Sequence, residues 1–137
     1  MTQTLFLADL QSRLALPERR LKSLARSVLA GEKLKGGLSI AFVDRATMRR
    51  INRQFLKHDF DTDVLAFPLD GPLIGEIVIS TDYAAKEAKR RKIPVIEEVS
   101  RYVVHGILHL AGYDDHARAA KSKMWKRQEA YLKPSQR

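Results

Sequence analysis

The pattern of hydrophobic and polar positions along the chain predicts short strands separated by amphipathic helices. Strands are expected, in chain order, at Leu5–Leu7, Leu38–Phe42, Val64–Phe67 and Ile74–Ser80. In the second of these, apolar residues alternate with smaller ones, which is typical of a half-buried strand. The fourth is almost continuously apolar, which favours a place in the middle of the sheet.

Residues that commonly start helices divide the rest of the chain. Helices are expected to begin near Pro17, Asp44, Asp82, Pro94 and Ala117. The first is expected to end at Gly31, and the second to bury Met48, Ile51 and Phe55 against the sheet. The sequence therefore predicts one α+β domain over residues 1–137, in which a small mixed β-sheet packs against helices.

The helix that starts near Pro94 carries two histidines, His105 and His109, spaced four residues apart. This spacing places both imidazoles on one face of a helix, one turn apart. The apolar stripe of the same helix uses other positions, namely Ile96, Val99, Val103, Ile107 and Leu110. The two histidines are therefore expected outside the core-facing stripe. A His-x3-His pair by itself more often means two ordinary histidines, so a third ligand is needed to argue for a metal site.

A third ligand is available just after this helix. Gly112 stands where a left-handed helix cap is expected, and the chain can then fold back to offer Asp115 or His116. Three protein ligands and one open position are typical of a catalytic zinc site. We therefore predict one Zn²⁺ ion per chain, held by a helix and the turn that follows it. Gly106 occupies the place of the glutamate base in H-E-x-x-H peptidases, which disfavours peptide hydrolysis.

Composition and charge narrow the choice of partner. The 137 residues include no cysteine and carry a formal net charge of +9. A chain without thiols is compatible with a reducing cytoplasm, and no apolar run approaches the length that spans a membrane. The excess of positive charge favours a polyanion, with RNA or DNA as the first candidate. Lysines and arginines cluster at residues 49–57, 86–92 and 118–127.

Three motifs in the same order resemble those of the YbeY family of metal-dependent endoribonucleases, which act in ribosomal RNA maturation. The family signature H-G-x-L-H-L-x-G-Y-D-H corresponds to residues 105–115. Its T-D-V-L-S-F-P and G-D-I-V-I-S motifs correspond to residues 62–68 and 75–80, and the resemblance extends from about Leu38 to Leu132. It implies single-stranded RNA as the substrate, ribosomal RNA and the small ribosomal subunit as partners, and a cytoplasmic location.

Two positions depart from the family pattern. The third metal ligand of the family is a histidine at the position of Asp115, and His116 follows one residue later. The distance to Met124 agrees with an ungapped register, which favours Asp115 and leaves His116 as the alternative. The second departure is Leu56, where the family usually has an arginine that assists cleavage.

Other residues are candidates for assisting cleavage in place of that arginine and for transferring a proton. Arg53, Lys57 and His58 flank Leu56, and the carboxylate of Asp114 lies next to the predicted ligands. The sequence thus predicts a zinc-dependent, single-strand-specific endoribonuclease in ribosomal RNA processing and ribosome maturation. Two alternatives stay open, a non-catalytic zinc-containing RNA- or ribosome-binding factor and a zinc peptidase.

Overall fold

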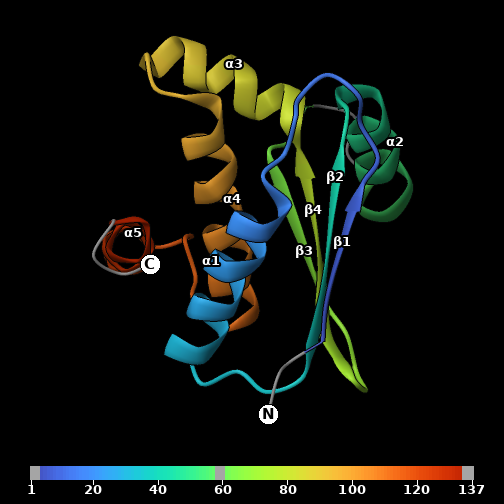
Figure 1. Ribbon diagram of the computed structural model, residues 1–137. Coiled ribbons are helices and arrows are strands. Elements are labelled where there is room, and N and C mark those ends of the chain that lie inside the picture. Colours follow the sequence, from blue (N-terminus) through green and yellow to red (C-terminus); the bar gives the residue numbers. More distant parts are fainter. Residues whose placement is uncertain (1–3, 58–60, 134–137) are drawn as a thin grey trace.

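In a computed structural model of the chain, the described residues are 4–57 and 61–133, and their strands form one mixed sheet (Figure 1). The strands are β1 (Leu5–Asp9), β2 (Gly37–Val43), β3 (Val64–Pro68) and β4 (Leu73–Ser80), in the spatial order β1-β2-β4-β3. β1, β2 and β4 are parallel, and the edge strand β3 runs antiparallel to β4. The predicted mixed sheet is confirmed, and β4 is an inner strand as its apolar run indicated.

Helices cover the two faces of the sheet unequally (Figure 1). The helices within the described residues are α1 (Glu18–Gly31), α2 (Arg45–Leu56), α3 (Thr81–Arg91), α4 (Val95–Leu110) and α5 (Arg118–Leu132). α1, α4 and α5 lie on one side of the sheet, and α2 lies on the other. None of these helices combines the length and the apolar character needed to cross a membrane.

The larger hydrophobic core lies between the sheet and α1, α4 and α5. Inward-facing residues of β2 and β4 meet apolar residues of these helices, and the largest of the fully buried ones include Leu21, Leu29, Leu38, Ile40, Phe42, Ile77, Ile79, Ile107 and Leu108. A smaller core lies under α2 and contains Val43, Met48, Leu65 and Val78. Because successive side chains of a strand point to opposite faces, the same strands supply both cores.

α4 is the central helix of the fold, since it packs against α1, α3, α5, β3 and β4. It approaches the sheet closely because Gly106 has no side chain: a Cβ atom there would lie 2.8 Å from Cγ2 of Ile77. The sequence predicted one apolar stripe on this helix, but the structure buries it on most sides, polar Ser100 and Arg101 included. The reason is the cover that α3 and α5 add on the flanks of α4.

Local signals fix most element boundaries, and two expectations need correction. Asp44 caps α2 as predicted, because its carboxylate accepts a hydrogen bond from the Thr47 amide at 2.8 Å. α3 starts at Thr81 rather than Asp82, because the Ser80 hydroxyl accepts from the Tyr83 amide and so takes the capping position. α1 ends at Gly31 as expected, and the left-handed residue that follows the helix is Lys33.

The burial expected for Phe55 is the second correction. It was expected to be buried, yet it is 64% exposed. Met48 fills the small core under α2, whereas Phe55 lies at the last turn of the helix, where its ring lies against Phe67 of the edge strand. The two ring centroids are 6.3 Å apart in an edge-on arrangement.

Candidate metal centre and the adjoining cleft

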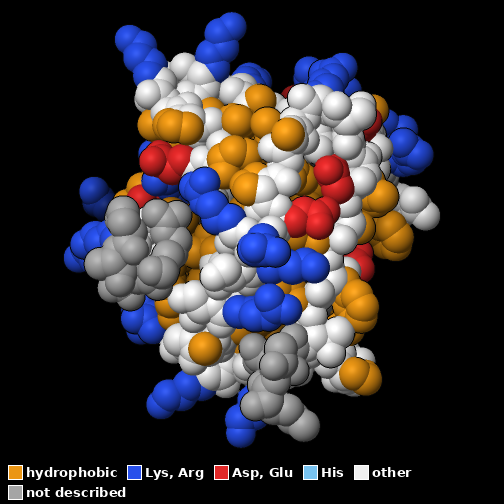
Figure 2. Space-filling view, viewed as in Figure 1, with side chains coloured by type: hydrophobic (Ala, Val, Ile, Leu, Met, Phe, Trp, Pro, Cys, Tyr) orange, Lys and Arg blue, Asp and Glu red, His pale blue; other side chains and the backbone are white. Residues whose placement is uncertain are grey.

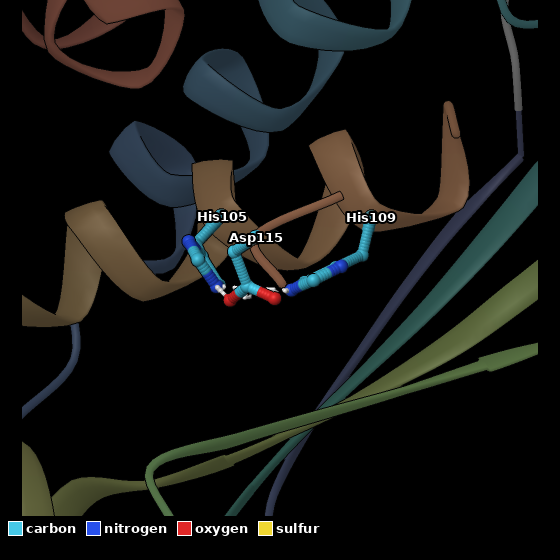
Figure 3. Close-up of side chains that lie close together, drawn as sticks. All are labelled: His105, His109 and Asp115. Atoms are coloured by element: carbon cyan, nitrogen blue, oxygen red, sulfur yellow. Dashed lines mark hydrogen bonds and ion pairs between the residues drawn. The ribbon is translucent and has the colours of Figure 1, made fainter. Parts of the chain in front are cut away.

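His105 and His109 leave α4 on the same side, as their spacing predicted (Figure 3). Their Nε2 atoms are 3.1 Å apart, and the two rings are nearly perpendicular, at 82°. Their side chains are 29% and 32% exposed, so both are partly withdrawn from water. Two imidazole nitrogens that point at the same spot are suited to share one metal ion.

The end of α4 returns the chain towards these histidines. Gly112 has a φ of 100°, and its amide donates to the His109 carbonyl at 3.0 Å. The Tyr113 amide donates to the Leu108 carbonyl, also at 3.0 Å, which completes a Schellman motif. The predicted left-handed cap at Gly112 is therefore confirmed. It reverses the chain within a few residues and brings Asp115 next to the histidines.

Asp115 completes a group of three converging ligand atoms. Its Oδ2 atom lies 3.8 Å from Nε2 of His105 and 3.7 Å from Nε2 of His109. Zinc at about 2.0–2.1 Å from tetrahedral nitrogen or oxygen ligands separates those ligands by about 3.3–3.4 Å. The observed separations of 3.1, 3.7 and 3.8 Å lie on both sides of that value. The three side chains therefore fit a tetrahedral metal ion with small adjustments.

Gln128 of α5 orients the first of these histidines. Its Oε1 atom lies 2.8 Å from Nδ1 of His105, and its amide nitrogen donates to Glu129. Because an amide oxygen only accepts, Nδ1 of His105 must carry the proton, and Nε2 of the neutral ring keeps its lone pair for a metal. Gln128 was not among the site residues predicted from the sequence. A glutamine in helical register with buried Met124 and Tyr131 was the available signal.

The environment of His109 favours its neutral form. Burial lowers its pKa below the usual 6.5, and the neighbouring His105 lowers it further, against the opposite effect of Asp115. A metal binds the unprotonated nitrogen, so a depressed pKa makes this histidine a better ligand near neutral pH.

Asp114 and His116 form a more exposed group beside this centre, with Asp115 as the shared member. The side chain of His116 is 91% exposed, and its Nε2 atom lies 3.7 Å from Oδ1 of Asp114. The same Asp114 oxygen accepts a hydrogen bond from the His116 amide at 2.9 Å. The geometry thus brings Asp115, and not His116, together with the two helix histidines. The ligand role of His116 and the proton-transfer role of Asp114 stay predictions.

Arg53 and Lys57 lie apart from this group. Both side chains are exposed on or just after α2, which packs on the other face of the sheet from α4 (Figure 1). Leu56, at the position of the family arginine, is 40% exposed at the end of the same helix. His58 lies outside the described residues. A role of these residues in cleavage stays a prediction, because the structure does not place them beside the three metal ligands.

A cleft of about 700 Å³ adjoins the metal centre. His105 and Asp115 line one part of it, and the remaining walls come mainly from α3, α4 and α5. Basic side chains on these walls are Arg90, Arg91, Arg101, Arg118 and Lys121, and acidic ones are Asp63, Glu87, Glu98 and Asp115. Arg90, Arg91 and Arg101 each pair with Glu87 or Glu98, so Arg118 and Lys121 supply the positive charge that remains. On the face that Figure 2 presents, lysines and arginines lie both around the outline and near the middle, and acidic side chains occupy fewer places. A polyanion bound by Arg118 and Lys121 would lie in the same cleft as His105 and Asp115.

An ion-pair network holds the helices around this cleft. Arg101 of α4 donates to both carboxylate oxygens of Glu129 on α5, at 2.8 and 2.9 Å, and to Glu98 at 2.9 Å. Arg91 of α3 reaches the same Glu98 oxygen at 2.9 Å. Glu98 and Arg101 are nearly buried, and a buried charge is stable only when it is paired. The network therefore fixes α3 and α5 on α4.

Comparisons with known proteins agree with this architecture and its motifs. The sequence model described as "Endoribonuclease YbeY" matches residues 7–136. A Chlorobium phaeovibrioides protein named endoribonuclease YbeY is 38% identical over 125 residues, which are 89% of this chain and 84% of that protein. One of the same name from Anaeromyxobacter sp. (strain Fw109-5) is 42% identical over 83% of this chain and 62% of its own length.

Solved structures add a match in fold. The solution structure of TM1509 from Thermotoga maritima aligns with a TM-score of 0.69 and 26% identity, over 94% of this chain and 87% of that one. The family match and the sequence relatives cover most of the described residues, including the helix and turn that carry His105, His109 and Asp115. The chain belongs to the endoribonuclease YbeY family.

Proposed function

We propose that this protein is a zinc-dependent endoribonuclease that cuts single-stranded RNA, and that it acts in ribosomal RNA processing and ribosome maturation. The observation that carries the proposal is the convergence of His105, His109 and Asp115 at the edge of a cleft that Arg118 and Lys121 also line. The relatives are named endoribonucleases, which agrees with a phosphodiester substrate. The ribosomal role follows from the motif resemblance.

Three residues would bind the metal ion, and a fourth orients one of them. His105, His109 and Asp115 would hold the ion, and Gln128 keeps His105 in the tautomer that binds it. Zinc supplies a Lewis acid and lowers the pKa of a bound water. Three protein ligands leave a coordination position open, whereas structural zinc sites usually fill all four. This favours an enzyme over a binding factor that uses zinc only for folding.

Other side chains would bind the phosphates of the RNA and transfer a proton. Arg118 and Lys121 on the cleft wall would hold phosphates of the RNA, and Asp114 would carry a proton near the reacting group. Arg53 and Lys57 stay candidates for stabilising the charge of the transition state. Attack by water and attack by the ribose 2′-hydroxyl are both compatible with this arrangement.

The peptidase alternative is weakened by the packing of Gly106. H-E-x-x-H peptidases need a glutamate at this position. Here a Cβ atom would already lie 2.8 Å from Ile77, between α4 and the sheet. A glutamate would be forced into the core rather than towards a substrate, so peptide hydrolysis lacks both the base and the room for it.

One variant separates an enzyme from a binding factor. His109→Ala removes one of two imidazole ligands, so bound zinc, measured by metal analysis, should fall from about one per chain to near zero. Cleavage of single-stranded RNA should be lost with it. RNA affinity should change by less than about tenfold, because the phosphates bind the basic walls. A zinc-loaded wild-type protein that binds RNA but never cuts it would support the binding factor, and digestion of casein would support the peptidase.

A further inference from the structure

Trp125 is the single tryptophan of the chain, and it is 48% exposed. It stands on α5 and lines the cleft that leads to the metal centre. The buried residues of this helix are Met124, Gln128 and Tyr131, so the hydrophobic core leaves the indole at the surface. A half-exposed aromatic side chain on a lysine- and arginine-rich helix is available to contact a ligand in the cleft.

Arg101 supports the indole from the protein side. Its guanidinium carbon lies 5.9 Å from the centroid of the indole. Arg101 is 8% exposed and is held in place by Glu98 and Glu129. A cation near the ring face of a tryptophan attracts it. The ring therefore rests on a fixed partner, and its remaining surface is open to the cleft.

Two cations stand beside Trp125 on the same wall of the cleft. Arg118 and Lys121 precede it by seven and four residues, which places all three on one face of α5. Both side chains are exposed, and neither forms an ion pair with any residue that the structure describes. From Arg118 to Trp125 the helix rises by about 10 Å. The α5 wall thus presents positive charge at its start, three residues after Asp115, and an aromatic surface one to two turns further along.

We propose that Trp125 is a stacking platform for a nucleobase of single-stranded RNA, next to the nucleotides joined by the bond that is cut, and that Arg118 and Lys121 bind the intervening phosphates. Stacking of bases on aromatic side chains, combined with a basic groove, is the way in which proteins hold single strands. The proposal rests on the RNA-cleaving function proposed above. It gives a physical reason for the choice of single strands, because a base inside a duplex has no free face to stack on Trp125.

The single tryptophan makes the contact directly measurable. The full-length, zinc-loaded protein is titrated with a single-stranded oligoribonucleotide of about twelve residues while tryptophan fluorescence is followed. An abasic oligonucleotide of equal length carries the same phosphates without bases. We expect quenching by the first and little by the second. Quenching by both alike would overturn the stacking proposal, as would a change that depends only on protein concentration, which would assign the surface to self-association.

Substitutions give a second readout that does not depend on fluorescence of the protein. With dye-labelled RNA, Trp125→Leu should weaken binding by about 5- to 150-fold, the range measured for the loss of one stacked base. Trp125→Phe keeps an aromatic face and should retain most of the affinity. Phe55→Leu, at another exposed aromatic residue on α2, is the matched control and should bind as wild type. Thermal unfolding of each variant checks that the fold is intact.

The outcomes separate this inference from the function on which it rests. If Trp125→Leu cuts RNA and binds it as tightly as wild type does, the stacking proposal is wrong and the proposed nuclease function stands. If RNA stacks on Trp125 but is never cut, the proposed nuclease function is wrong and Trp125 belongs to an RNA-binding site. A protein that neither binds nor cuts single-stranded RNA overturns both.

Discussion

Nδ1 of His105 lies 2.8 Å from Oε1 of Gln128, so a residue of α5 sets the orientation of an imidazole on α4. The contact joins positions 23 residues apart in the sequence. It places the proton of His105 on the nitrogen that faces away from the other two ligand atoms, because the amide oxygen of Gln128 can only accept. The metal centre therefore depends on the docking of α5 as well as on its own motif.

The first prediction concerns this contact. Gln128→Leu should lower zinc affinity by about 10- to 100-fold, the usual effect of losing a partner that orients a ligand. Gln128→Glu keeps an acceptor for Nδ1 of His105 and should retain most of the affinity. Competition with a chelator of known affinity measures both, and Gln54→Leu on α2 is the control for a surface glutamine. Equal zinc affinity of Gln128→Leu and wild type would mean that the contact does not orient the ligand.

A second prediction decides the third ligand. Asp115→Ala should lower zinc affinity at least tenfold more than His116→Ala, because Oδ2 of Asp115 is within 3.8 Å of both histidine nitrogens and the His116 ring is 91% exposed. Asp115→His restores the residue of the family signature and should keep zinc bound. The opposite order of losses would assign the role to His116, and small, equal losses would exclude both.

The third prediction concerns pH and the ion pair between Arg101 and Glu129. Burial raises the pKa of Glu129, but hydrogen bonds from Arg101 and Gln128 outweigh it, and the pKa is held below its usual 4.5. A carboxylate whose pKa is lower in the folded chain than in the unfolded chain stabilises the fold above the unfolded value. That stabilisation is lost as pH falls through the folded pKa, because the carboxylate must then be protonated.

Glu129→Gln should therefore lower the free energy of unfolding by about 1–3 kcal/mol at pH 7, as expected for a lost hydrogen bond to a charged group. The difference from wild type should shrink as the pH is brought below 4.5, the usual pKa of the group. Urea unfolding at several pH values measures it, and Glu18→Gln, at an exposed position of α1, is the control. A difference that is constant over this pH range would show that the charge of Glu129 is not its cause.

The parts of this protein that could be predicted from the sequence are those set by near neighbours in the chain. The Asp44 cap depends on an amide three residues away, and the left-handed Gly112 depends on carbonyls of the last turn of α4. The spacing of His105 and His109 likewise determines that both side chains lie on one face, because both residues are in the same helix. Such features need no knowledge of the rest of the fold.

The features that could not be predicted depend on which elements meet. Gln128 contacts His105 only because α5 packs on α4, and Phe55 is exposed only because α2 extends past its small core. The all-round burial of α4 has the same origin. Periodicity reports one apolar stripe, whereas Arg101 and Glu98 are buried as an ion pair that no stripe would reveal.

The last prediction tests the basic wall of the cleft by its response to salt. Lysines and arginines that bind phosphates release counterions, and for single strands each phosphate contact contributes about 0.7 to the slope of log affinity against log salt concentration. Replacing Arg118 and Lys121 by alanine should therefore reduce that slope by about 1.4 and weaken binding to all RNA sequences alike. The matched control is the pair Lys123→Ala and Lys126→Ala, which removes the same charge from exposed positions of α5 that do not line the cleft. If the control pair changes the slope as much as the cleft pair, the attraction is a property of net charge, and RNA does not follow the cleft to the metal centre.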